Sequence, residues 1–191
     1  NGLTHIKFDQ NITKLCESIG HVPIPPYLNR ADRETDRERY QTVFANHRFT
    51  DSAAAPTASL HFDDELFDSV NKNFTTCKIS LAVGLGTFKP LSDEPITESS
   101  TLHDEDFFIS DESAKLINNQ IKNDKRVISI GTTTLRALEA AWCNKLNVIK
   151  PGKNTTNIFI KEGYKFKVVN CLVTNFHLPQ SSLLMLVSAF S

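Results

Sequence analysis

Hydrophobic and polar residues follow one another in short segments along this chain, and their spacing predicts both helices and strands. At the start, an apolar run predicts a strand over residues 3–8. The next apolar residues have helical spacing and predict a helix over 12–19, which Asn11 caps and Gly20 ends. Residues 21–27 are rich in proline and cannot form a helix or a central strand, so they predict an extended connector.

A charge run and a second helical pattern come next. Residues 30–39, RADRETDRER, mix acidic and basic side chains, which favours a solvated linker that leads into a helix over about 35–45. The small residues of 51–60 predict a loop. Asp63 then caps a helix whose apolar residues lie on one face.

From residue 77 onward, strand-like segments alternate with helical ones. Residues 89–106 are polar and predict a long loop. Ser110 is the expected cap of one helix, and Thr132 or Thr133 is the expected cap of another. The other predicted elements are strands over 79–83, 126–130, 158–160 and 166–173 and a C-terminal helix over 183–190. Such alternation favours an α/β fold with a layered sheet.

Composition places the chain among ordinary globular proteins. Its 191 residues are enough for one substantial domain, and 40% of them are hydrophobic and 23% charged. The net charge of −1 excludes a general nucleic-acid binder, so a polyanionic partner would need a local basic patch. No apolar run reaches the roughly 20 residues of a membrane span and no secretion signal is visible, so a cytoplasmic location is expected.

The four cysteines are scattered and include no C-x-x-C pair, so we expect inert thiols in a reducing compartment and no metal site. The chain starts at Asn1 instead of Met and stops at Ser191, directly after an apolar helix. Both ends are therefore expected to be cuts inside a larger protein.

The turn at Gly131, Thr132 and Thr133 follows a predicted strand and opens a helix. Free backbone N–H groups at such a helix start suit a carboxylate, a phosphate or a ribose hydroxyl, and Arg136 is placed to pair with an anion. An ordinary capped turn is the alternative. Because neither the G-x-G-x-x-G nor the G-x-x-x-x-G-K-[ST] pattern is present, spacing alone favours the ordinary turn.

A second polar tip follows the last predicted strand. Thr174, Asn175 and His177 lie between that strand and a helix, which is the usual place for a ligand site in an α/β protein. His61, His103 and His177 are each isolated, and an isolated histidine is more often structural than catalytic. Gly84 and Gly86 after another strand indicate a tight turn. Spacing alone therefore supports only an α/β domain with a candidate polar cleft.

Several segments, taken together and in order, resemble one enzyme family, the S-adenosylmethionine:tRNA ribosyltransferase-isomerases of the queuosine pathway. The resemblance covers nearly the whole chain. The segments that carry it are GHVPIPPY at 20–27, DRERYQTV at 36–43, APTA at 55–58, LHF at 60–62, VGLGTF at 83–88, GTT at 131–133, Arg136, and NFHLP at 175–179 with the helix 183–190.

The resemblance implies an α/β fold, a three-layer sheet with helices on both faces, in which the family's inserted β-barrel is mostly absent from this chain. Residues 1–20 would be the exit of that barrel and a connecting helix. Residues 21–191 would be a portion of the catalytic α/β domain that is incomplete at both ends.

The family's activity is implied in the same way. Such an enzyme transfers and isomerises the ribosyl part of S-adenosylmethionine onto 7-aminomethyl-7-deazaguanine at the wobble position of a tRNA with a GUN anticodon. The product is epoxyqueuosine, and adenine and methionine leave. S-adenosylmethionine is then a co-substrate, no further cofactor or metal is expected, and the protein is expected to be monomeric.

This chemistry needs a base of near-neutral pKa, donors for sugar hydroxyls and a cation for the methionine carboxylate. His177 is the preferred catalytic residue because Pro179 and the next helix fix its backbone, and His61 and His103 are the other candidates. The substrate-binding candidates are Thr57, Gly84, Gly86, Thr87, Thr132, Thr133, Arg136 and Asn175. The tRNA-binding candidates are Tyr27, Arg37, Arg39 and Tyr40, although the two tyrosines also suit core packing.

The chain departs from the family pattern at four polar positions. Ala82 and Ser100 stand where the family usually has histidines, Ser59 where it has a glycine, and Asn170 where aspartate is common. Two alternatives to an active enzyme follow. The chain could be a weakened remnant that binds tRNA or S-adenosylmethionine without turnover, or the fold could be reused as a scaffold that contacts other proteins.

Overall fold

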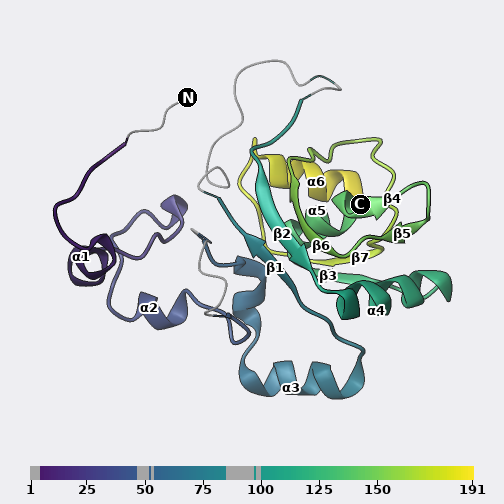
Figure 1. Ribbon diagram of the computed structural model, residues 1–191, viewed down its shortest axis with the longest axis horizontal. Coiled ribbons are helices and arrows are strands. Elements are labelled where there is room, and N and C mark those ends of the chain that lie inside the picture. The colour runs from purple at the N-terminus through teal and green to yellow at the C-terminus, as the bar shows by residue number, and fades with distance from the viewer. Residues whose placement is uncertain (1–4, 47–51, 53, 85–96, 98–99) are drawn as a thin grey trace.

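The computed structural model describes residues 5–46, 52, 54–84, 97 and 100–191, and its helices and strands confirm the α/β fold class (Figure 1). Strand β3 (Ile128–Ile130) pairs in parallel with β7 (Cys171–Val173), so that Ile128 lies opposite Cys171. Parallel strands need a long crossover connection, and here the crossover begins with helix α5 (Thr132–Ala140). This pair brings the Gly131 turn and the tip after Val173 to the same end of a sheet.

An antiparallel sheet of three strands lies beside this pair. Its order is β1 (Ile79–Ala82), β2 (Glu105–Ile109) and β6 (Gly152–Thr156). The prediction of a long loop over 89–106 is wrong for its last two residues, because β2 begins at Glu105. Burial alternates along β2, with Glu105, Phe107 and Ile109 inside. The acidic residues concealed this strand, because one of them faces the interior and is ion-paired there.

A short hairpin was also missed by the sequence pattern. Strands β4 (Trp142–Cys143) and β5 (Val148–Ile149) form it, and α4 (Asp111–Lys122) packs against β5. The side chain of Asn118 in α4 donates to the Ile149 carbonyl at 3.0 Å and accepts from the Ile149 N–H at 2.7 Å. This reciprocal pair holds the hairpin on the helix in place of a longer sheet.

The core lies between α5, α6 (Ser182–Phe190) and the strands, and α5 contacts β1, β3 and β6. The largest apolar side chains that are fully buried are Ile109, Leu135, Ile149, Ile160 and Leu186. Each such side chain contributes roughly 1.5–3 kcal/mol when it leaves water. Helix α5 is therefore the central support of the site described below.

Glu139 explains why most of the predicted strand 166–173 is absent. Its side chain is 4% exposed and accepts hydrogen bonds from the backbone N–H groups of residues 167–169 at 2.9–3.0 Å. The Tyr164 hydroxyl donates to the same carboxylate at 3.3 Å. Because these N–H groups are used by a side chain, they cannot pair with a neighbouring strand, and only Cys171–Val173 forms one. Residues 158–160 are not a strand either.

In the N-terminal part, the predicted helix over 12–19 is confirmed, and the strand predicted before it is wrong over residues 5–8. Helix α1 (Ile12–Ile19) begins at Asn11, whose side chain accepts from the Lys14 N–H at 3.2 Å, and ends at Gly20. Residues 5–8 form no strand, and the rest of the predicted strand 3–8 lies outside the described residues. A division of the chain at residue 20 stays a prediction.

The second predicted helix is much shorter than expected. Over 35–45 only α2 (Asp36–Arg39) is helical, since most side chains there are exposed and no apolar face is buried to extend it. A 3-10 turn (Pro26–Leu28) precedes it, and another (Thr57–His61) leads to α3 (Asp64–Asn73). Figure 1 shows α1 and α2 away from the sheets, on the left of the molecule.

Candidate functional site

The Gly131 turn joins the ends of the parallel strands. Gly131 has a φ of 94°, a conformation that favours glycine, and its N–H donates to the Val173 carbonyl at 2.8 Å. Gly131 itself is the N-cap of α5, so the expectation that Thr132 or Thr133 caps this helix is wrong. Within the described residues the hydroxyls of Thr132 and Thr133 make no side-chain hydrogen bond. They stay available beside the free N–H groups of the helix start.

The tip after β7 contacts a segment more than a hundred residues away. His61, at the end of the 3-10 turn Thr57–His61, donates from Nε2 to Asn175 Oδ1 at 2.7 Å. His177 Nε2 lies 3.0 Å from the Thr174 hydroxyl oxygen. Partial burial lowers the pKa of His177 below its ordinary value, which favours the neutral ring. The predicted residues His61, Asn175 and His177 therefore meet at one tip.

A buried acid at the start of β2 organises a second cluster. Glu105 is 1% exposed, and its Oε2 lies 2.9 Å from Nη2 of Arg136, which is 2% exposed. Its other oxygen, Oε1, lies 3.1 Å from Nε2 of His103. A Cβ placed on Gly84 would lie 3.7 Å from Cδ2 of His103, so the ring lies beside the backbone just after β1. Three predicted site residues thus lie close together here, Gly84, His103 and Arg136. Glu105, which contacts two of them, was not predicted.

The polar composition of residues 89–106 predicts a loop, and this pattern conceals the buried Glu105 at the start of β2. The alternation of Glu105, Phe107 and Ile109 just before the Ser110 cap was the available signal for an inward-facing acid on a strand.

The Glu105–Arg136 pair is costly to break. Burial lowers the pKa of Arg136, and the charge of Glu105 opposes that shift. Arg136 Nε makes no hydrogen bond to the part of the chain that the structure describes, and its Nη2 is close to Glu105 without good hydrogen-bond alignment. Removal of one member of such a buried pair typically costs about 3–5 kcal/mol. The guanidinium keeps unused donor capacity inside the molecule.

The remaining predicted residues are more dispersed. Thr57 is half-buried near His61, whereas Gly86 and Thr87 lie outside the described residues. Tyr27 and Arg39 are exposed, and Arg37 is exposed and donates to the Gly20 carbonyl at 3.4 Å. The Tyr40 hydroxyl is buried near the Ala55 backbone, and burial raises the pKa of Tyr40. No hydrogen bond or ion pair among the described residues links these tRNA-binding candidates to Glu105 or Asn175.

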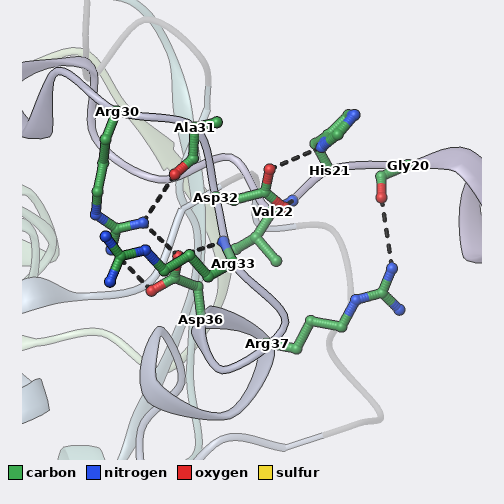
Figure 2. A network of polar contacts seen from close by, with 9 residues as sticks. All are labelled: Gly20, His21, Val22, Arg30, Ala31, Asp32, Arg33, Asp36 and Arg37. Atoms are coloured by element: carbon green, nitrogen blue, oxygen red, sulfur yellow. Dashed lines mark hydrogen bonds and ion pairs between the residues drawn. The ribbon is translucent and has the colours of Figure 1, made fainter.

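The charge run is less solvated than its sequence suggests (Figure 2). Asp36 accepts from both Nη atoms of Arg30 at 2.7 and 2.9 Å and from the Arg33 N–H at 2.8 Å, and these contacts lower the pKa of Asp36 to about 2. Asp32 binds His21 Nδ1 at 2.7 Å. The side chains of Arg33, Arg37 and Arg39 are exposed on the surface of this network, together with those of Glu34 and Glu38.

Of the four residues that were expected to depart from the family pattern, Asn170 and Ser100 make side-chain hydrogen bonds within the fold. Asn170 Oδ1 accepts from the Val127 N–H at 2.7 Å and so helps to align β3 with β7. The Ser100 hydroxyl accepts from the Thr97 N–H at 2.9 Å. Ser59 is 2% exposed, and Ala82 ends β1 half-buried.

None of the described groups of His, Cys, Asp and Glu side chains has the geometry to hold a metal ion. None of the described helices is long and apolar enough to cross a membrane.

Sequence comparisons match the chain to known enzymes. A family model described as queuosine biosynthesis protein matches residues 1–191. An S-adenosylmethionine:tRNA ribosyltransferase-isomerase of Caldanaerobacter subterraneus subsp. tengcongensis is 44% identical over 185 residues, which are 96% of this chain and 52% of that relative. The protein of the same name from Francisella tularensis subsp. novicida is 46% identical over 190 residues, which are 99% of this chain and 55% of the relative. The chain thus spans about half the length of the curated relatives it matches.

A structural comparison agrees with the sequence matches. The chain resembles the crystal structure of an S-adenosylmethionine tRNA ribosyltransferase from Thermotoga maritima, with a TM-score of 0.51 and 30% sequence identity. The similarity covers 70% of this chain and 40% of that protein.

Proposed function

Because the chain belongs to the queuosine biosynthesis protein family, we propose that it is a portion of an enzyme that modifies tRNA with S-adenosylmethionine. The reaction is transfer and isomerisation of the ribosyl group onto 7-aminomethyl-7-deazaguanine at the wobble position, which gives epoxyqueuosine. The observation that carries this proposal is the match over residues 1–191, and two groups of polar side chains, one around Glu105 at the start of β2 and one after β7, support it.

The reaction sets clear demands on these side chains. The sulfonium acidifies the ribose carbon beside it, so a base removes that proton, and adenine and methionine leave as the sugar rearranges onto the aminomethyl nitrogen. A histidine is the ordinary base near neutral pH. His61, His103 and His177 are the candidates for proton transfer, and all three lie within hydrogen-bond reach of a polar partner.

The helix start at Gly131 is the proposed binding site for the sugar or the carboxylate of S-adenosylmethionine. The free hydroxyls of Thr132 and Thr133 suit the ribose, and the unused donors of Arg136 suit a carboxylate. The other proposed substrate-binding residues are Thr57, Gly84, Gly86, Thr87 and Asn175.

The partners follow from the same proposal. The tRNA has a GUN anticodon and contacts Tyr27, Arg37, Arg39 and Tyr40, which belong to the segment with exposed arginines. S-adenosylmethionine is a co-substrate and no other cofactor or metal takes part. The enzyme works as a monomer in the cytoplasm, where its tRNA substrate is found.

A second candidate function is binding without turnover. Ala82 and Ser100 stand where the resemblance leads us to expect histidines, and the Ser100 hydroxyl accepts a hydrogen bond from the nearby Thr97 N–H. A remnant of this kind would hold tRNA in a salt-sensitive manner and release no adenine.

Adenine release separates the two functions. The full-length protein is incubated with S-adenosylmethionine and tRNA that carries the 7-aminomethyl-7-deazaguanine base, and free adenine is measured over time. The matched control is the same tRNA with an unmodified guanine. Adenine that forms only with the precursor tRNA supports the enzyme, whereas salt-sensitive tRNA binding with no adenine above the control supports the remnant.

A further inference from the structure

We infer that Glu105 is a positioning residue that fixes the tautomer of His103, and that His103 is the proton acceptor among the three candidate histidines. The assignment of the tautomer rests on geometry alone. The role of proton acceptor rests on the proposed function.

The position of Glu105 is set by β2 and by α5. The alternation of β2 turns Glu105 inward, where its two oxygens meet different partners, Arg136 Nη2 at 2.9 Å and His103 Nε2 at 3.1 Å. Arg136 comes from the second turn of α5, which is itself buried in the core. The carboxylate is therefore held from the inner side of the molecule and presents one oxygen to the histidine.

The chemistry of the three groups then determines where the proton of His103 lies. Arg136 is always protonated, and a carboxylate buried beside it is ionised and can only accept hydrogen bonds. His103 Nε2 must therefore carry a hydrogen and donate it to Glu105 Oε1. In the neutral ring this leaves the lone pair on Nδ1, which is the nitrogen able to take a proton from a substrate.

The free nitrogen of His103 is accessible while its ring is held. The side chain keeps 30% of its exposure, and Nδ1 makes no hydrogen bond to the described part of the chain. The neighbours of His103 on both sides are fixed to Asn157, because Leu102 N–H donates to its carbonyl at 2.9 Å and Asp104 accepts from its side chain at 3.0 Å. A ring that is fixed at one nitrogen and free at the other has the arrangement that general-base catalysis requires.

The other two candidates lack this arrangement. His61 pairs with the amide of Asn175, and His177 pairs with the hydroxyl of Thr174. Both partners are neutral: Asn175 Oδ1 accepts from His61 Nε2, whereas the Thr174 hydroxyl can donate or accept and imposes no tautomer on His177. Neither partner carries the negative charge that would stabilise the protonated ring after proton transfer.

The tautomer is tested first by nitrogen NMR on the chain itself, without any substrate. Two-bond ¹⁵N–¹H correlations distinguish histidines protonated at Nε2 from those protonated at Nδ1. We expect neutral His103 to be protonated at Nε2. His21 is an internal control of opposite type, because its Nδ1 is the nitrogen that faces a carboxylate, that of Asp32 at 2.7 Å.

The variants separate a positioning role from a structural one. Glu105→Gln removes the charge with little change in size, and in it the His103 signal should shift to a mixture of tautomers while that of His21 stays unchanged. Because this variant leaves Arg136 unpaired, the double variant Glu105→Gln/Arg136→Met is measured beside it as a form without the buried pair. Glu162→Gln, at an exposed turn, is the matched control for charge removal.

Turnover completes the test in the full-length protein. In both variants we expect kcat for adenine release to fall by roughly 10²–10⁴-fold, the contribution of a positioned general base. KM for S-adenosylmethionine should stay unchanged in Glu105→Gln, whereas it should rise in the double variant, because Arg136 is a proposed contact of the substrate. The inference is overturned if neutral His103 is protonated at Nδ1, or if each folded molecule of both variants keeps the parent kcat. An absence of turnover in the parent protein would contradict the proposed function instead, because the NMR measurement tests the tautomer independently.

Discussion

At the scale of single residues, His177 gives the site a pH dependence that can be measured by stability. Partial burial disfavours its charged form and lowers the pKa of His177 in the folded chain below the unfolded value of about 6.5. Between these two values the unfolded chain binds more protons than the folded one, so stability rises with pH. The contribution is fully present above pH 6.5 and is lost as the pH falls through the folded pKa.

We therefore predict that His177→Gln weakens the fall in stability between pH 7 and pH 5. The measurement is urea unfolding at several pH values, with His5→Gln as the control because His5 is exposed. Curves for the parent chain and His177→Gln that keep the same separation at every pH would show that His177 titrates alike in both states.

Residues whose partners are close in sequence could be predicted from the sequence, and residues with distant partners could not. The caps Asn11, Asp63 and Ser110 all accept from a backbone N–H three residues later, which is why a local pattern was sufficient to find them. The Glu105–Arg136 pair joins a strand to a helix that follows in the chain, and no local rule connects them. The helix start at Gly131 pointed to Arg136, whereas the polar composition of residues 89–106 predicted a loop at its partner Glu105.

At the scale of secondary-structure elements, Glu139 shows how one side chain replaces a strand. Its carboxylate binds the N–H groups of residues 167–169, so this segment packs against α5 without joining β7. Hydrogen bonds to a charged group contribute about 1.5–3 kcal/mol each. The sequence predicted a strand here because residues 166–173 are rich in the strand formers valine and phenylalanine, and this local composition carries no information about an acid on a distant helix.

We predict that Glu139→Gln destabilises the chain by about 2 kcal/mol or more, because the amide keeps one acceptor oxygen and adds two donors beside buried N–H groups. The measurement is chemical unfolding together with hydrogen exchange of residues 167–169, which should lose protection first. Tyr164→Phe is the matched comparison, since it removes only the hydroxyl donor at 3.3 Å and should cost about 1 kcal/mol. Equal losses in the two variants would contradict a special role for the carboxylate.

The short strands set the limit of prediction at this scale. Strands β4 and β5 have two residues each, and β6 is formed by the polar residues Gly152–Thr156. Strand β5 is held by Asn118 of α4, and β6 is held by pairing with β2. These strands therefore depend on distant parts of the chain, which a local pattern does not show. The helices were easier to predict, because their caps and apolar faces lie within one segment.

At the scale of the whole molecule, the net charge of −1 and the proposed tRNA partner require positive charge to be concentrated in one region. The charged run at 30–39 has as many acids as arginines, and its local arrangement pairs Asp32 with His21 and Asp36 with Arg30 (Figure 2). Arg37 and Arg39 stay exposed and are the proposed phosphate contacts, although Glu34 and Glu38 are exposed beside them. The overall α/β fold could be predicted from alternating segments. The separation of α2, in this charged segment, from β2, which begins at Glu105, became visible only in three dimensions (Figure 1).

We predict that Arg37→Ala/Arg39→Ala weakens tRNA binding by the full-length protein through lost phosphate contacts. Each such contact contributes roughly 0.7–0.9 to the slope of log affinity against log salt, so the slope should fall by about 1–2. Adenine release at saturating tRNA should stay unchanged, since no hydrogen bond among the described residues links these arginines to the Glu105 cluster. The control is Arg126→Ala, which removes an exposed arginine just before β3, outside the charged N-terminal segment. An unaltered slope in the double variant would mean that the tRNA backbone is bound by another surface.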